Sequence, residues 1–226
     1  MSIKGKAYIA GIFEHPARKI ANMSLAQLHA ECAKGALEDA GLTIHDVDGY
    51  YCSTDAPGSL GGINMIDYMG LTVKHSDSTN TGGSSYLYLV AHAAEAIAAK
   101  LWGAELCRFG VNGSSGSNHA AVMAVASPGD KVIVSRTLHK SVLVGMVYAG
   151  VVPVWIRPEI NPATGLPEYL PSSRLAETIA AHPDAKAVLI GEPSYVGTMS
   201  NIPRLSKVCH DAGIPLIVDA AWAAHY

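Results

Sequence analysis

Apolar positions in the second half of the chain form short continuous runs that alternate with longer amphipathic stretches. The runs have the length of strands, and the stretches between them repeat apolar residues at helical spacing. Uninterrupted apolar strands joined through helices are typical of a parallel sheet with helices on both faces. The pattern therefore predicts an α/β fold. The predicted strands are 107–111, 131–134, 151–156, 187–191 and 214–219, and the predicted helices are 118–126, 139–149, 172–181 and 203–212.

The first half of the chain has a less regular pattern. Ser24 begins an amphipathic helix that Gly41 closes, because serine is a favoured helix N-cap and glycine a favoured C-terminal residue. A polar turn at 79–85 leads into an alanine-rich helix at 86–102. We predict a boundary between two segments, 1–100 and 101–226. The remaining predicted elements of the first segment are strands at 6–12 and 47–52 and a helix at 63–69.

Composition narrows the classes of partner and environment. The chain has 226 residues, of which 49% are hydrophobic and 15% charged, as in a folded protein. A net charge of −3 without a long basic tract predicts neither a nucleic-acid nor a membrane partner. No apolar run reaches 18 residues, so we expect a cytoplasmic protein. The four cysteines lie far apart and the ten histidines are scattered, which predicts reduced thiols and no metal site.

Two polar segments carry the candidate chemistry. Asp219 ends an apolar run, and residues 111–119 form a Gly/Ser-rich link between a predicted strand and a predicted helix. Such a link offers backbone N–H groups and hydroxyls to a phosphate, while a strand-end carboxylate can meet a buried cation. Together they predict a cofactor with a phosphate and a ring nitrogen, and pyridoxal phosphate fits best. The alternatives are a plain helix-capping turn at 111–119 and a capping role for Asp219.

Residues 101–226 resemble the major domain of the Orn/Lys/Arg decarboxylases, a branch of the aspartate-aminotransferase-like (fold type I) pyridoxal-phosphate enzymes. Four of the family's motifs occur in order. They are N-G-T-S-x-x-N at 112–118, R-N-x-H-K-S at 136–141, P-T-Y-x-G at 193–197 and D-x-A-W/H at 219–222. The resemblance implies an incomplete aspartate-aminotransferase-like large domain.

The resemblance also implies roles for individual residues. Asp219 would keep the ring nitrogen protonated, and His139 would stack on the ring, so these two are the implied catalytic residues. Without the resemblance, a helix cap or a surface position explains His139 as well as stacking on a ring does. The implied cofactor-binding residues are Ser114, Ser115 and Gly116 at the phosphate, His139 and Ala221 on the two ring faces, Asp219 at the ring nitrogen, Ser194 near the phenolic oxygen, and Trp222 with His225 at the cavity wall.

The implied activity is decarboxylation of ornithine, lysine or arginine, with a small-molecule amino acid as substrate and a homodimer as the assembly. In this family the lysine that holds the cofactor lies in an S-x-H-K motif beyond the D-x-A-W segment. The sequence ends at Tyr226 before such a motif. We therefore expect the chain as given to lack covalent cofactor attachment and to be inactive.

Residues 1–100 resemble the start of a thiolase-superfamily protein of the lipid-transfer-type acetyl-CoA acetyltransferase kind. The matching segments are 5–11, 37–42, 46–49 and 80–85, the last leading into the alanine-rich helix. Gly83 stands where true thiolases carry the nucleophilic cysteine. This resemblance predicts a partial thiolase-like α/β segment and a fusion near 98–102. The alternatives to a decarboxylase are an acyl-CoA-binding module using Gly82–Ser85, or a catalytically empty scaffold.

Overall fold

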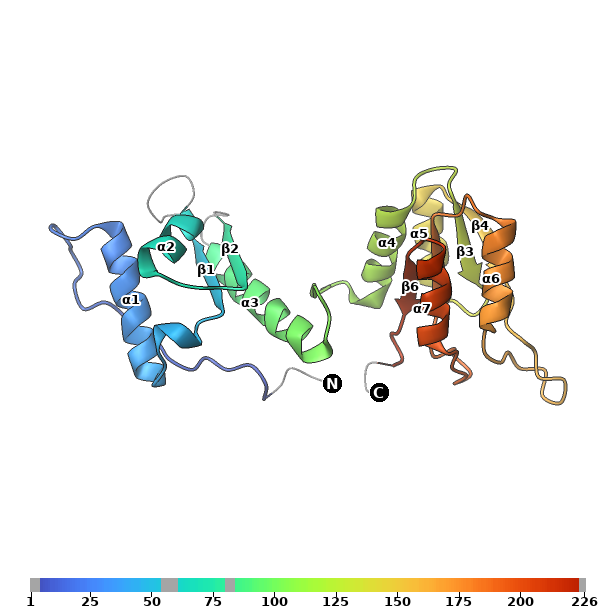
Figure 1. Cartoon of the computed structure of the whole chain (residues 1–226), viewed down its shortest axis with the longest axis horizontal. Coiled ribbons are helices and arrows are strands. Elements are labelled where there is room, and N and C mark those ends of the chain that lie inside the picture. The colour runs from blue at the N-terminus through green and yellow to red at the C-terminus, as the bar shows by residue number, and fades with distance from the viewer. Residues whose placement is uncertain (1–4, 54–60, 80–83, 224–226) are drawn as a thin grey trace. The chain divides into compact units, whose positions relative to one another are not determined.

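The computed structural model describes residues 5–53, 61–79 and 84–223 (Figure 1). These residues divide into two compact units, separated between Phe109 and Gly110. The predicted boundary at residue 100 lies inside the first unit. Residues after it stay with this unit, since the Phe109 amide donates to Glu95 Oε1 at 2.7 Å. The identities predicted for the two segments remain predictions.

The C-terminal unit is built on a four-stranded parallel sheet with the order β4-β3-β5-β6. The register places Val132 opposite Ala187 and Val188 opposite Leu216. This confirms the predicted parallel α/β fold. The strands are β3 (Lys131–Ser135), β4 (Val152–Ile156), β5 (Ala187–Gly191) and β6 (Leu216–Asp219).

Helices cover both faces of this sheet, as predicted (Figure 1). Alternate residues of a strand point to opposite faces, so Val132 and Val134 of β3 pack into one core and Ile133 into the other. The first core includes Val122 and Val142 from the helix pair α4 and α5. The second belongs to the pair α6 and α7. The helices are α4 (Gly113–Val125), α5 (Lys140–Ala149), α6 (Ser172–Ala181) and α7 (Ile202–Asp211).

Cys209 of α7 is fully buried in the second core, and this burial raises the pKa of its thiol to about 11. A raised pKa leaves less of the reactive thiolate at pH 8. We therefore expect iodoacetamide to label Cys209 much more slowly than the partly exposed Cys32 and Cys107 of the folded chain. Peptide mapping by mass spectrometry checks this. Unfolding in urea should speed the labelling of Cys209. If Cys209 is labelled as fast as Cys32 and Cys107 in the native chain, and urea does not speed its labelling, the described packing is contradicted.

The N-terminal unit has a two-stranded parallel sheet, in which Gly49 lies opposite His75 and Ser53 opposite Thr79. Ser24 Oγ accepts from the Gln27 amide at 3.1 Å, which confirms the predicted start of the first helix. Its elements are α1 (Leu25–Ala40), the short 3-10 helix η1 (Ile44–Asp46), β1 (Gly49–Ser53), α2 (Gly61–Met69), β2 (His75–Thr79) and α3 (Ser85–Trp102).

Two predicted strands, 6–12 and 107–111, are wrong. In the first, the Ile12 amide donates to Asp39 Oδ2 at 2.9 Å and no strand pairs with the described part of the segment. In the second, the Phe109 amide donates to the side-chain carboxylate of Glu95, and residues 107–111 form no strand. β2 was not predicted, because its sequence is polar throughout.

Among the described residues, no helix is long and apolar enough to cross a membrane. The same part of the chain holds no group of three or more His, Cys, Asp or Glu side chains that could bind a metal ion. The predicted compartment is not tested by these observations.

Candidate cofactor site

The site lies where the order of the sheet reverses. The chain goes from β3 outward to β4 on one side, then returns to β5 beside β3 and continues outward to β6 on the other. In open parallel sheets, ligands bind at such a switch point, outside the carboxyl ends of the strands. A pocket of about 120 Å³ is found there. Its lining residues are Ser114, Thr137, His139, Gly191, Pro193, Tyr195, Asp219, Ala221 and Trp222.

The pocket brings together five predicted cofactor residues that come from separate parts of the sequence. Ser114 lies in the first turn of α4, His139 precedes α5, and Asp219 ends β6, with Ala221 and Trp222 just beyond it. Four lining residues were not predicted from the sequence: Thr137, Gly191, Pro193 and Tyr195. Pro193 and Tyr195 lie inside the quoted P-T-Y-x-G motif and Thr137 inside the R-N-x-H-K-S motif, which were the available signals.

The predicted phosphate loop is the beginning of a helix. α4 starts at Gly113, well before the predicted start at residue 118, so Ser114, Ser115 and Gly116 are helical. A Cβ on Gly116 would meet the Asn112 Cβ at 2.9 Å. The close approach of Asn112 therefore accounts for a glycine at position 116. Neither Gly116 nor Ser115 lines the pocket.

The N-terminus of α4 is suited to an anion. The first four N–H groups of a helix have no intrahelical acceptor, and the helix dipole adds partial positive charge there. Asn112 stands at the N-cap position, but its side chain accepts no hydrogen bond from the helix. Ser114 is exposed on this first turn and faces the pocket. The arrangement leaves the positive end of a 13-residue helix available to a ligand.

Asp219 is half-buried and held by two hydrogen bonds. Its Oδ2 accepts from Asn118 Nδ2 at 2.8 Å, and its Oδ1 accepts from the Ala221 amide at 3.2 Å. The second bond closes a local turn, and the alternative that Asp219 caps a following element stays a prediction. An ionised carboxylate has about four lone-pair sites, so these bonds leave room for a further donor.

His139 is the N-cap of α5. Its Nδ1 accepts from the Ser141 amide at 3.2 Å and lies 2.9 Å from Ser141 Oγ. This confirms the helix-capping interpretation. The same ring lines the pocket, so capping and a contact with a bound ring are compatible.

Ser194 does not line the pocket. It is 4% exposed, and its Oγ lies 2.7 Å from Thr198 Oγ1, where it stabilises the turn after β5. A contact with the cofactor's phenolic oxygen stays a prediction. His225 lies outside the described residues.

A sequence model of the family described as "Orn/Lys/Arg decarboxylase, major domain" matches residues 66–226. The chain belongs to this family. Arginine decarboxylase from Halalkalibacterium halodurans is 37% identical over 132 residues, which are 58% of this chain and 27% of that protein. Inducible ornithine decarboxylase from Escherichia coli is 29% identical over 200 residues, covering 76% of this chain and 27% of that protein. The chain thus spans about a quarter of the length of these decarboxylase relatives.

Solved structures agree on the fold. A chain of the SepCysS-SepCysE N-terminal domain complex matches 56% of this chain and 34% of its own length, with a TM-score of 0.50 and 17% sequence identity. At this identity the likeness concerns the α/β fold alone.

The decarboxylase family match begins upstream of the predicted boundary. Starting at residue 66, it includes 80–85 and 98–102, the segments on which the thiolase resemblance and the fusion partly rest. Part of the predicted acyl-CoA contact, Gly82–Ser85, lies outside the described residues. The thiolase-like segment, the fusion and the acyl-CoA-binding alternative all stay predictions.

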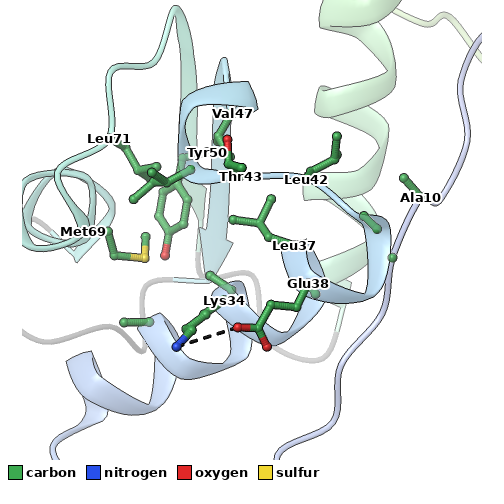
Figure 2. Close-up of a pocket in the computed structure, with 16 residues that line it drawn as sticks. Ala10, Lys34, Leu37, Glu38, Leu42, Thr43, Val47, Tyr50, Met69 and Leu71 are labelled. Carbon is green, nitrogen blue, oxygen red and sulfur yellow. Dashed lines mark ion pairs between the residues drawn. The ribbon is translucent and has the colours of Figure 1, made fainter.

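The N-terminal unit contains a larger cavity of about 720 Å³ (Figure 2). Figure 2 shows Leu37, Val47 and Leu71 among its walls, and the charged groups of Lys34 and Glu38 pair with each other at 3.7 Å. This lining is mainly alkyl. In contrast, the pocket at the carboxyl ends of the strands combines a carboxylate, an imidazole and a helix N-terminus, which are groups that can hold a charged cofactor.

Proposed function

We propose that the pocket at the ends of β3, β5 and β6 is the pyridoxal-phosphate site of a basic amino acid decarboxylase. The observation that carries the proposal is that Ser114, at the start of α4, and Asp219, at the end of β6, line one pocket. One offers the positive end of a helix and the other a negative carboxylate. Pyridoxal phosphate carries the complementary pair, a phosphate anion and a protonated ring nitrogen.

Each residue of the pocket then has a defined task. Ser114 and the first N–H groups of α4 hold the phosphate. Asp219 keeps the ring nitrogen protonated through a charge-assisted hydrogen bond. His139 and Ala221, which both line the pocket, would contact the ring. When bound, the cofactor supplies an electron-accepting ring that stabilises the negative charge left at the substrate's Cα.

The size of the pocket limits what the described residues do alone. Its volume of about 120 Å³ is below the lower end, about 300 Å³, of small-molecule sites. These residues therefore enclose the cofactor only in part. The donor set nevertheless fits the group, because the lining combines a positive helix N-terminus with a carboxylate, and the cofactor carries the complementary phosphate and ring nitrogen.

The substrate class and the assembly are inferred from the family. Relatives named as arginine, lysine and ornithine decarboxylases support a basic amino acid substrate. Among the described residues that line the pocket, Asp219 is the single acidic side chain, and it is assigned to the ring nitrogen. We infer that recognition of the substrate's distal cation uses other residues, and that the assembled protein is a homodimer.

Titration with pyridoxine 5′-phosphate tests the site. This analogue lacks the aldehyde, so it cannot form imines with surface lysines and reports only the pocket. Calorimetry should show saturable binding of one ligand per chain, and unphosphorylated pyridoxine should bind at least about tenfold more weakly, because the helix N-terminus acts on the phosphate. Absence of saturable binding, or equal affinity for the two ligands, would reject the proposal.

Ser114→Asp is expected to separate binding from stability. A carboxylate in the first turn of α4 would repel the phosphate and lower the affinity for pyridoxine 5′-phosphate at least about tenfold. The same charge complements the helix dipole, so the melting temperature should stay constant or rise. Ser172→Asp is the matched control, because it adds the charge at the start of α6, away from the pocket. If both variants bind like the wild type, α4 does not hold the phosphate.

A further inference from the structure

Asn118 connects two residues of the proposed site. Its Nδ2 lies 2.8 Å from Asp219 Oδ2 and 2.9 Å from Ser141 Oγ. Ser141 Oγ in turn lies 2.9 Å from His139 Nδ1. The Asn118 side chain is buried, with 7% of the residue exposed. It therefore joins α4, α5 and the end of β6 through one side chain.

The directions of the hydrogen bonds in this network follow from the Asn118 amide and the Ser141 backbone N–H. An amide nitrogen has two hydrogens and accepts none, so it donates one to Asp219 and the other to Ser141. Ser141 Oγ is then an acceptor toward Asn118, and its own hydrogen is left for His139 Nδ1. The Ser141 amide also donates to His139 Nδ1, at 3.2 Å, so the two hydrogens share the one lone pair of this nitrogen. His139 Nδ1 is consequently an acceptor, and the proton of the neutral ring is on Nε2.

We propose that Asn118 is a positioning residue of the cofactor site. It fixes the Asp219 carboxylate in the orientation that meets the ring nitrogen and, through the Ser141 hydroxyl, orients the His139 ring, whose tautomer the Ser141 amide sets. The role in cofactor binding rests on the proposed function, whereas the network belongs to the free chain. This role requires a side-chain nitrogen with two hydrogens, one for the Asp219 carboxylate and one for the Ser141 hydroxyl. Aspartate at this position would oppose the Asp219 carboxylate with a second one, and serine has a single hydrogen.

The network can be tested without any cofactor. In NMR spectra of the free chain, both Asn118 side-chain amide hydrogens should exchange slowly with water, and the signal is identified by its loss in Asn118→Ser. Ser141→Ala should shift and deprotect one of the two hydrogens, and Asp219→Ala the other. A fast-exchanging Asn118 side-chain amide, or one that neither substitution changes, would overturn the proposal. The test therefore does not depend on the stability of a single variant.

The positioning role has a selective binding signature. The comparison uses pyridoxine 5′-phosphate and its analogue with carbon in place of the ring nitrogen. The wild-type chain should prefer the nitrogen compound, and Asn118→Leu should reduce this preference at least about fivefold, because Asp219 loses its fixed orientation. The preference for phosphorylated over unphosphorylated ligand should stay unchanged. A general packing defect would lower both preferences, and that outcome would overturn the positioning role.

The matched control is Asn161→Leu, which removes another asparagine–carboxylate bond, from Asn161 Nδ2 to Glu168 Oε1 at 2.8 Å, in a loop outside the pocket. It should leave both preferences unchanged. The two proposals fail differently. If the wild-type chain binds no pyridoxine 5′-phosphate, the proposed function and the positioning role fall, while the protected amide still establishes the network. If binding is normal and the amide is unprotected, Asn118 alone is misassigned.

Discussion

Asp219→Ala is expected to weaken the binding of pyridoxine 5′-phosphate about 100-fold. The substitution removes a half-buried carboxylate whose hydrogen bond to the protonated ring is charge-assisted. Bonds to charged groups contribute about 1.5–3 kcal/mol, and each 1.4 kcal/mol is about tenfold in affinity. Calorimetric titration of both chains gives the ratio directly, and circular dichroism shows whether the fold is retained.

Two further variants make this result specific to the ring nitrogen. Asp219→Asn keeps the size of the side chain but loses the charge, and it should bind nearly as weakly as the alanine variant. Asp184→Ala removes a different carboxylate, which pairs with Lys131 at 2.9 Å on the surface, and should bind like the wild type. If Asp219→Asn retains wild-type affinity, the carboxylate does not hold a protonated nitrogen.

Leu205→Ala is expected to have the largest effect on stability, about 3–4 kcal/mol. Leu205 of α7 is fully buried in the core that includes Ile133 and Val188 of the sheet. Shortening it removes apolar contacts and leaves a cavity that the two central strands cannot easily fill. Urea denaturation followed by circular dichroism measures the loss in the free energy of unfolding of the C-terminal unit.

Leu166→Ala provides the matched control, because Leu166 is 50% exposed in the loop before α6. Its effect should stay within about 0.5 kcal/mol. A loss below 1 kcal/mol for Leu205→Ala would mean that α7 does not pack on the sheet as described.

The sheet and its helices were largely predictable, because strands buried on both faces appear in the sequence as continuous apolar runs. β5 is an unbroken apolar run, and α6 begins and ends where the pattern predicts. The start of α4 was missed because its Gly/Ser-rich first turns have low helix propensity. Packing against α5 overrides that propensity. In the opposite sense, the apolar pattern at 107–111 predicted a strand, yet Val111 is 95% exposed.

The individual groups of the site were easier to predict than the connections between them. Asp219 was marked by its place at the end of an apolar run, and residues 112–118 by their Gly/Ser content. The bond from Asn118 to Asp219 joins residues 101 positions apart, and no local spacing records it. The same holds for Ser141, whose role follows only from the packing of α5 on α4.

Chemical-shift mapping with pyridoxine 5′-phosphate on the ¹⁵N-labelled chain tests the central claim most directly, because it locates both ends of the ligand at once. We expect the largest backbone amide changes at Ser114 and Ser115, beside the phosphate, and at Ala221, whose amide is bonded to Asp219. Changes confined to the N-terminal unit, or saturation with no change at Ser114 and Ala221, would contradict the assignment of this pocket.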